Sequence, residues 1–123
     1  MRVRALVGKH CEIVGPETPI SEVALAMKTL GVNAVAVVDR TGLVGICTDW
    51  DVAMAVADGC DPDVAVSDRM ALSPDTIDAE APARDAALWL LETGYRHLPV
   101  LEDGELLGII DSRDLLWAVM PKQ

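Results

Sequence analysis

Two short segments, residues 45–52 and 108–115, carry the side chains that could do chemistry. In each, an apolar run turns polar where a helix is expected to begin, and the unpaired backbone N–H groups there favour anions. Thr48 offers a hydroxyl to a phosphate or a sugar, and Asp51 could accept hydrogen bonds from the two neighbouring hydroxyls of a ribose. The same Thr-x-x-Asp spacing fits a capping box, in which both side chains serve only their own helix. The spacing leaves both interpretations open.

An internal repeat places the two segments at matched positions. When residues 17–56 are shifted by 63 positions without a gap, twelve of the forty residue pairs are identical. About two or three identities would be expected by chance. One matched pair, Asp51 and Asp114, has no evident role in a core. The repeat therefore predicts two related half-sites around a pseudo-twofold axis.

The first copy is expected to follow the order β-α-β-β-α. Residues 11–14 are short and apolar, and Thr18 before Pro19 predicts a helix with a hydroxyl N-cap and proline in the first helical position. Gly31 is expected to end this helix. A strand at 34–38, a turn at 39–42, a strand at 43–46 and a helix from Thr48 to about Ala57 follow.

The second copy repeats this order after an acidic connector that has a helical turn near 66–70. It comprises an extended stretch at 76–77, a helix at 82–93, strands at 98–101 and 106–110 around Asp103-Gly104, and a helix at 112–120. One copy is too small to be stable alone, so the copies should pack together on their sheets. The expected fold class is α+β (α/β), with two repeats packed sheet to sheet.

Composition excludes several classes of function. The net charge of −10 argues against nucleic acid and anionic membranes, which require a basic face. No apolar stretch approaches the ~20 residues of a membrane helix, and the basic start of the chain is interrupted too early for a secretory signal. We expect a soluble cytoplasmic protein, with the three cysteines as small apolar residues.

Catalytic and metal-binding patterns are missing from the sequence. It has two histidines, no nucleophile motif and no phosphate-binding loop of the G-x-x-x-x-G-K type. The acidic connector lacks the spacing of a calcium loop. We expect neither an enzyme nor a metal site, and no required cofactor.

The duplicated unit, with residues 31–38 and 94–101 leading to Gly-Ile-x-Thr-x-x-Asp in the first copy, resembles a pair of CBS (cystathionine beta-synthase) domains, a Bateman module. The resemblance implies repeat 1 at residues 8–60, a linker at 61–73 and repeat 2 at 74–121. It also implies a regulatory protein that binds an adenosine-containing ligand (AMP, ADP, ATP, S-adenosylmethionine or an NAD-like molecule) in the cleft between the repeats. Such a protein would act as a metabolite or energy sensor, through a homodimer or an unidentified regulated protein. The alternative is a ligand-free dimerisation or interaction module in which Thr48 and Asp51 only cap a helix.

The resemblance also implies roles for individual residues. Asp51 would bind the ribose hydroxyls and Thr48 would lie near the phosphate. The other implied ligand contacts are Asn33, Ile46, Trp50, Tyr95, Arg96, Ile109, Arg113 and Asp114.

One position departs from the family pattern. Asp111 stands where the family usually has Ser or Thr, which would place a carboxylate next to a phosphate. We therefore expect the first cleft to be the better nucleotide site, and the second to be empty, metal-assisted or suited to a ligand without a phosphate. Dimer contacts are expected on the helices at 50–57 and 112–120, with Trp117 and Met120 among them.

Overall fold

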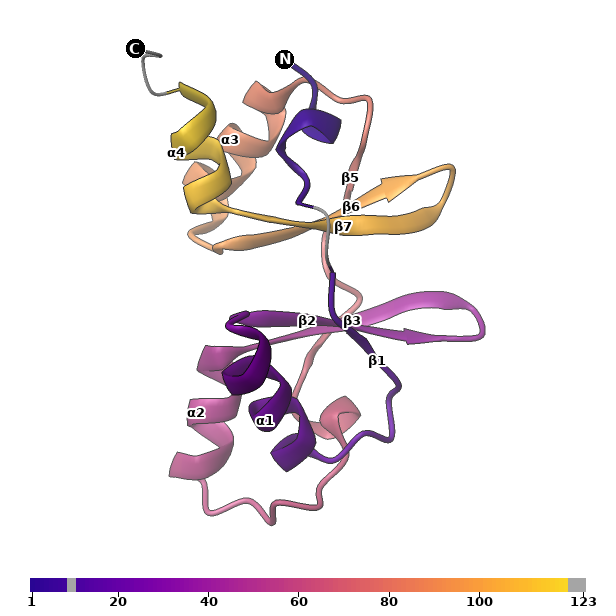
Figure 1. Cartoon of the computed structure of the whole chain (residues 1–123), viewed down its shortest axis with the longest axis vertical. Coiled ribbons are helices and arrows are strands. Elements are labelled where there is room, and N and C mark those ends of the chain that lie inside the picture. Colours follow the sequence, from indigo (N-terminus) through magenta and orange to yellow (C-terminus); the bar gives the residue numbers. More distant parts are fainter. Residues whose placement is uncertain (9–10, 120–123) are drawn as a thin grey trace. The chain divides into compact units, whose positions relative to one another are not determined.

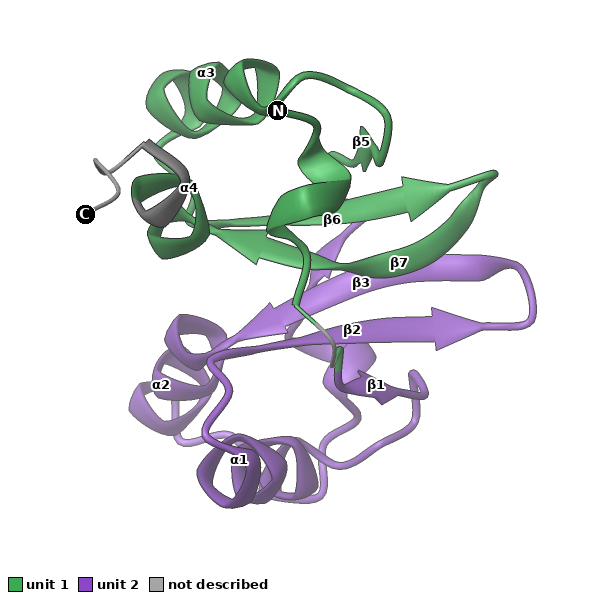
Figure 2. Cartoon of the chain, turned by 45° about the horizontal axis from the view of Figure 1, so that its top comes forward, with its two compact units in different colours: residues 1–11, 75–123 green, residues 12–74 purple. Residues whose placement is uncertain are grey.

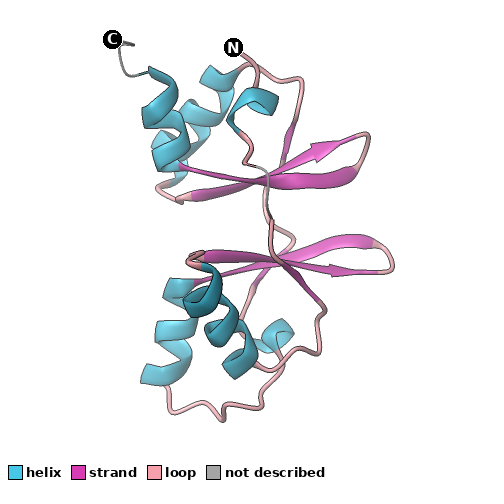
Figure 3. Cartoon of the chain, in the orientation of Figure 1, coloured by secondary structure: helices cyan, strands magenta, loops and turns pink. Residues whose placement is uncertain are grey.

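The computed structural model describes residues 1–8 and 11–119, with side chains through Leu116. These residues form an α+β fold with two separate sheets and four α-helices, which confirms the predicted class (Figure 3). They divide into two compact units (Figure 2). One unit spans residues 12–74, and the other combines residues 1–11 with residues 75–123.

The unit of residues 12–74 has a four-stranded sheet with two helices on one side (Figure 1). The strand order is β1-β2-β3-β4, with β1 parallel to β2 and the other neighbours antiparallel. Its elements are β1 (Ile13–Val14), α1 (Ile20–Leu30), β2 (Ala34–Asp39), β3 (Gly42–Thr48), α2 (Asp49–Ala57), the 3₁₀ turn η2 (Val66–Asp68) and β4 (Ala71–Leu72).

The second unit repeats this plan with a three-stranded sheet in the order β5-β6-β7. Asp103 and Gly104 both have positive φ, the conformation of a tight two-residue hairpin turn, as the sequence predicts. The elements are η1 (Val3–Leu6), β5 (Ile77–Asp78), α3 (Ala83–Thr93), β6 (His97–Glu102), β7 (Glu105–Asp111) and α4 (Ser112–Val119).

Alternation along the strands builds each core. In the unit of residues 12–74, Val35, Val37 and Cys47 are fully buried and pack with Val23 and Met27 of α1. The corresponding cluster of the second unit contains Leu98, Val100 and Ile110, together with residues of α3, α4 and η1. Because neighbouring residues of a strand point to opposite faces, the residues between these core positions lie on the sheet face away from the helices.

The N-terminal segment belongs to the core of the second repeat. Val3 is fully buried there, and its N–H donates to Ala81 O at 2.9 Å. The same contact occurs 63 residues later, where Val66 is fully buried in the other unit and donates to Thr18 O at 2.8 Å. Each repeat is therefore preceded by a segment that completes the core of the other.

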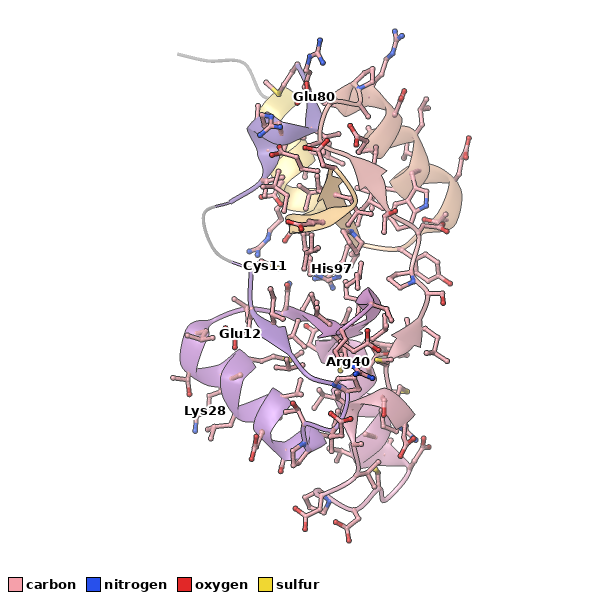
Figure 4. The ribbon with its side chains drawn as sticks, turned by 90° about the vertical axis from the view of Figure 1, so that its right-hand side faces the viewer. Cys11, Glu12, Lys28, Arg40, Glu80 and His97 are labelled. Carbon is pink, nitrogen blue, oxygen red and sulfur yellow. The ribbon has the colours of Figure 1, made fainter. Side chains whose placement is uncertain are left out.

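An exposed ion-pair network holds the N-terminal segment in place. Arg2 pairs with Glu80 at 2.7 Å, and Arg4 pairs with Glu80 at 2.9 Å and also with Glu102. Figure 4 shows Glu80 beside this segment. Exposed ion pairs contribute little stability, so the apolar contacts of Val3, Leu6 and Val7 with the core cluster contribute more to the attachment.

Two predicted helix starts are wrong by one residue. Helix α1 begins at Ile20, and its N-cap is Pro19 without a side-chain cap, whereas the sequence suggested Thr18. The N–H groups of Ile20 and Ser21 donate instead to Val64 O and Pro62 O of the connector. Helix α3 begins at Ala83, with Pro82 as its N-cap.

The structure also extends the predicted elements. Strands β3 and β7 are longer than expected, and η1 and β4 were not predicted. The helical turn expected near 66–70 is present as η2. Met120 and the side chain of Trp117, two expected dimer contacts, lie outside the described part. No helix in the described ranges has both the length and the apolar character needed to cross a bilayer.

The matched burial of Val3 and Val66 predicts matched stability losses. Replacing either valine by alanine should lower the free energy of unfolding by about 1–3 kcal/mol, because a buried side chain is truncated. Urea denaturation measures this loss. Leu72→Ala is the control, since Leu72 is 70% exposed, and it should change stability by less than about 0.5 kcal/mol. A Val3→Ala variant as stable as the wild type would show that the N-terminal segment is not part of the core.

Candidate functional site

The first junction lies where β3 ends and α2 begins, and a capping box closes it. Thr48 is the N-cap, and its N–H donates to Asp51 Oδ2 at 2.8 Å. The Thr48 hydroxyl donates to the same oxygen at 3.2 Å and accepts the N–H of Asp51 at 3.4 Å. The helix-capping interpretation of the Thr-x-x-Asp spacing is therefore confirmed.

Capping leaves part of Asp51 for a second role. Both hydrogen bonds from Thr48 reach Oδ2, so Oδ1 can accept from another donor, and the residue is only partly buried. A ribose diol bound by Asp51 stays a prediction. The Thr48 hydroxyl is engaged on both sides, so a phosphate there would have to share it.

Neighbouring strands hold the first junction in position. The N–H of Asp49 donates to Asn33 O at 3.0 Å, which joins the start of α2 to the strand β2 that follows Asn33. Cys47 points into the helix-side core, so the adjacent Ile46 lies on the opposite sheet face. Trp50, on the first turn of α2, is 66% exposed.

Cys47 is a core residue and not a nucleophile. Burial raises the pKa of its thiol to about 12, and the negative charge of Asp51 adds to the shift. A thiol with this pKa carries almost no thiolate at neutral pH, and the thiolate is the reactive form.

The second junction lies between β7 and α4. Its main-chain hydrogen bonds match those of the first junction, but the residue before the helix is Asp111 in place of a threonine. The N–H of Asp111 donates to Asp114 Oδ2 at 2.8 Å, as Thr48 does to Asp51. Asp111 Oδ1 accepts the N–H groups of Arg113 and Asp114 at 2.9 and 3.0 Å. The N–H of Ser112 donates to Arg96 O at 3.1 Å, the counterpart of the bond from Asp49 to Asn33.

The two carboxyl groups of this junction shift in opposite directions. Burial raises the pKa of Asp114 above its ordinary value, and the nearby charge of Asp111 adds to this. Burial acts in the same direction on Asp111, but the N–H groups of Asp114 and Arg113 and the Arg113 charge outweigh it and lower the pKa of Asp111. Asp111 is thus held as a carboxylate.

An aromatic pair stands near the second junction. Tyr95 is 68% exposed, and its ring centroid lies 6.0 Å from that of Trp89. Trp89 is fixed in turn, because its Nε1 donates to Asp75 Oδ2 at 2.8 Å. The two rings are tilted by 32° to one another, so the anchored indole lies against one side of the exposed Tyr95.

A family model for the CBS domain matches residues 3–58 and again residues 66–121. The chain belongs to the CBS-domain family. The second match begins 63 residues after the first, which is the same shift as in the sequence repeat. Val3 and Val66, each buried in its own unit, are also 63 residues apart.

Curated relatives resemble the chain over most of its length. A 17.7 kDa protein of Acidianus ambivalens is 33% identical over 110 residues, covering 88% of this chain and 66% of the relative. The chain spans about two thirds or less of the first curated relatives it matches, 66% and 59%.

Solved CBS structures agree with the fold. The CBS-domain containing protein ATU1752 of Agrobacterium tumefaciens is 28% identical with a TM-score of 0.88, covering 98% of this chain and 100% of that one. CBSX2, solved in complex with AMP, is 26% identical with a TM-score of 0.81, covering 95% and 94%.

Each CBS unit gathers half of the predicted contact residues. The unit of residues 12–74 brings together, at its first junction, Asn33, Ile46, Thr48, Trp50 and Asp51. The other unit brings together Tyr95, Arg96, Ile109, Arg113 and Asp114.

Sequence reasoning missed two features of these junctions. Asp49 accepts the N–H of Trp50 at 2.9 Å, and Asp75 anchors Trp89. Two acidic residues in the stretch 48–51 and two more in its counterpart 111–114 could have indicated the first, but no local pattern indicates the second. Within residues 1–8 and 11–119, no group of three or more potential ligand side chains forms a metal site.

The capping box of the first CBS repeat predicts a specific stability effect. Thr48→Val removes the hydroxyl at nearly constant volume and should lower the free energy of unfolding by about 1 kcal/mol. Thr48→Ser should keep most of that stability, as measured by urea denaturation. Thr18→Val is the matched control, because no side chain caps α1. Equal losses in Thr48→Val and Thr18→Val would contradict a capping role for Thr48.

Proposed function

We propose that this chain is a regulatory CBS pair that binds an adenosine-containing ligand at its strand-to-helix junctions. The ligand class comprises AMP, ADP, ATP, S-adenosylmethionine and NAD-like molecules. Following the family resemblance, such a ligand would contact both repeats, and its occupancy would be reported through contacts with a second copy or with a regulated protein. The proposed role is regulatory and not catalytic, in the cytoplasm.

One observation carries this proposal. Asp51 and Asp114 lie 63 residues apart, and each accepts, through Oδ2, the N–H of the residue three positions before it. This bond fixes the carboxylate and leaves Oδ1 for a pair of hydroxyl donors. The AMP complex of the related CBSX2 supports the choice of an adenosine ligand.

Binding at a junction would change the arrangement of the repeats only under one condition. The ligand must prefer one arrangement over another, because equal affinity for both shifts no equilibrium. A ligand that contacts side chains of two repeats at once has this property, since its contacts depend on how the repeats are placed. The side chains at the two junctions are the proposed source of that difference in affinity.

The ligand proposal can be tested with a variant that keeps the cap. Asp51→Asn retains an oxygen for the Thr48 N–H but loses the charged acceptor for a ribose. At a hundredfold excess over its dissociation constant, a ligand should stabilise the wild type by about 2.7 kcal/mol. Urea denaturation with AMP, ATP, NAD or S-adenosylmethionine measures this gain, which Asp51→Asn should largely lose.

Asp61→Asn is the matched control, because Asp61 also accepts a main-chain N–H, at 2.8 Å, but lies away from the junction. It should gain as much stability from the ligand as the wild type. If no member of the panel stabilises the wild type at millimolar concentration, the interaction module is the better account. In that case the capping box alone explains Thr48 and Asp51.

We also propose that the chain forms a homodimer through its helical surfaces. An apolar groove of about 160 Å³ lies on the helix side of the unit of residues 12–74. Its lining includes Ile20 and Ala24 of α1 and Val52 and Val56 of α2. On the second repeat, Leu116 of α4 is 60% exposed. Apolar surface of this kind favours burial against a partner.

Dimer formation predicts a clear effect of one charge. Val56→Glu places a carboxylate on the groove and should convert a dimeric wild type into a monomer at the same concentration, because burying an unpaired charge is costly. Sedimentation equilibrium gives the mass directly. Thr41→Glu, in the exposed β2–β3 turn, should remain dimeric. A monomeric wild type would refute the dimer.

A further inference from the structure

The carboxylate of Asp111 distinguishes the second junction from the first. Its Oδ1 collects two main-chain N–H groups at the start of α4, those of Arg113 and Asp114. Its Oδ2 lies 3.5 Å from Nη2 of Arg113, and its side chain is only 16% exposed. These are the partners that an anion at a helix start would use, so the chain supplies its own anion here.

The first junction holds the corresponding N–H groups much less firmly. The N–H of Asp51 donates to the neutral hydroxyl of Thr48 at 3.4 Å. The N–H of Trp50 donates to Asp49, whose exposed side chain can rotate into solvent. A phosphate could take over these donors without displacing a buried charge.

We propose that Asp111 is a specificity-determining residue that excludes phosphate from the second junction, so that the chain binds a phosphorylated adenosine ligand at the Thr48 junction alone. This inference rests on the proposed function and deepens it. It makes the two half-sites of the repeat chemically different, although their main-chain connections are the same.

Electrostatics supports the exclusion. Asp111 stays charged at neutral pH, because its N–H partners and Arg113 lower its pKa. A phosphate beside Asp111 would bring two negative charges into contact, and the carboxyl group of Asp114 lies nearby as well. Arg113 offsets this repulsion only weakly, because its side chain is 80% exposed and its contact with Asp111 is 3.5 Å long, and exposed charges are screened by solvent.

Exchanging the two cap residues tests the inference with little risk to the fold. Thr and Asp are both good N-caps, so Asp111→Thr and Thr48→Asp each copy one junction into the other. Isothermal titration with AMP should give one site per chain for the wild type, two for Asp111→Thr, no site of wild-type affinity for Thr48→Asp and one for the double variant. Thr48→Asp should weaken AMP binding by at least about tenfold, because like charges in contact repel strongly.

Two controls isolate the phosphate. Adenosine, which lacks a phosphate, should bind the wild type and Asp111→Thr equally. Glu105→Thr removes one exposed negative charge from the same unit and should still give one AMP site. Circular dichroism of each variant checks that it is folded.

The outcomes separate this inference from the proposed function. Two AMP sites in the wild type, or one in Asp111→Thr, would overturn the role of Asp111 while nucleotide binding stands. Unchanged AMP binding in Thr48→Asp would overturn it as well. If neither the wild type nor Asp111→Thr binds AMP or adenosine, the proposed function fails and this inference fails with it.

Discussion

The hydrogen bond from a cap residue's N–H to the aspartate three positions later is the constraint on which the candidate site depends. It occurs at 2.8 Å in both repeats, from Thr48 to Asp51 and from Asp111 to Asp114. It fixes the turn from strand to helix and sets the direction of each carboxylate. A bond that is structural in origin can therefore prepare a side chain for a ligand, since it occupies only one carboxylate oxygen.

Each of the two cores behind these turns is completed by a valine from a segment next to the repeat. Val3 completes one core and Val66 the other, each from a segment that precedes the opposite repeat in sequence. The chain must pass between the two units to achieve this, so neither repeat has a complete core by itself.

The sequence predicts the order of elements because periodicity, turn glycines and the 63-residue shift all act locally. It fails where long-range contacts decide. The connector carbonyls of Val64 and Pro62, not Thr18, satisfy the start of α1. Val3 could have been expected by extending the repeat backwards to Val66, but nothing local marks it as buried. The Thr48 and Asp51 spacing predicted a cap correctly, yet spacing alone cannot indicate whether Oδ1 binds a ligand.

A crystal structure of the chain with AMP would locate the ribose relative to Asp51. We expect both ribose hydroxyls to lie within hydrogen-bond distance of Asp51 Oδ1, while Oδ2 still accepts the N–H of Thr48. A nucleotide bound without any contact to the Asp51 carboxylate, or one that breaks the bond between Thr48 and Asp51, would contradict this expectation.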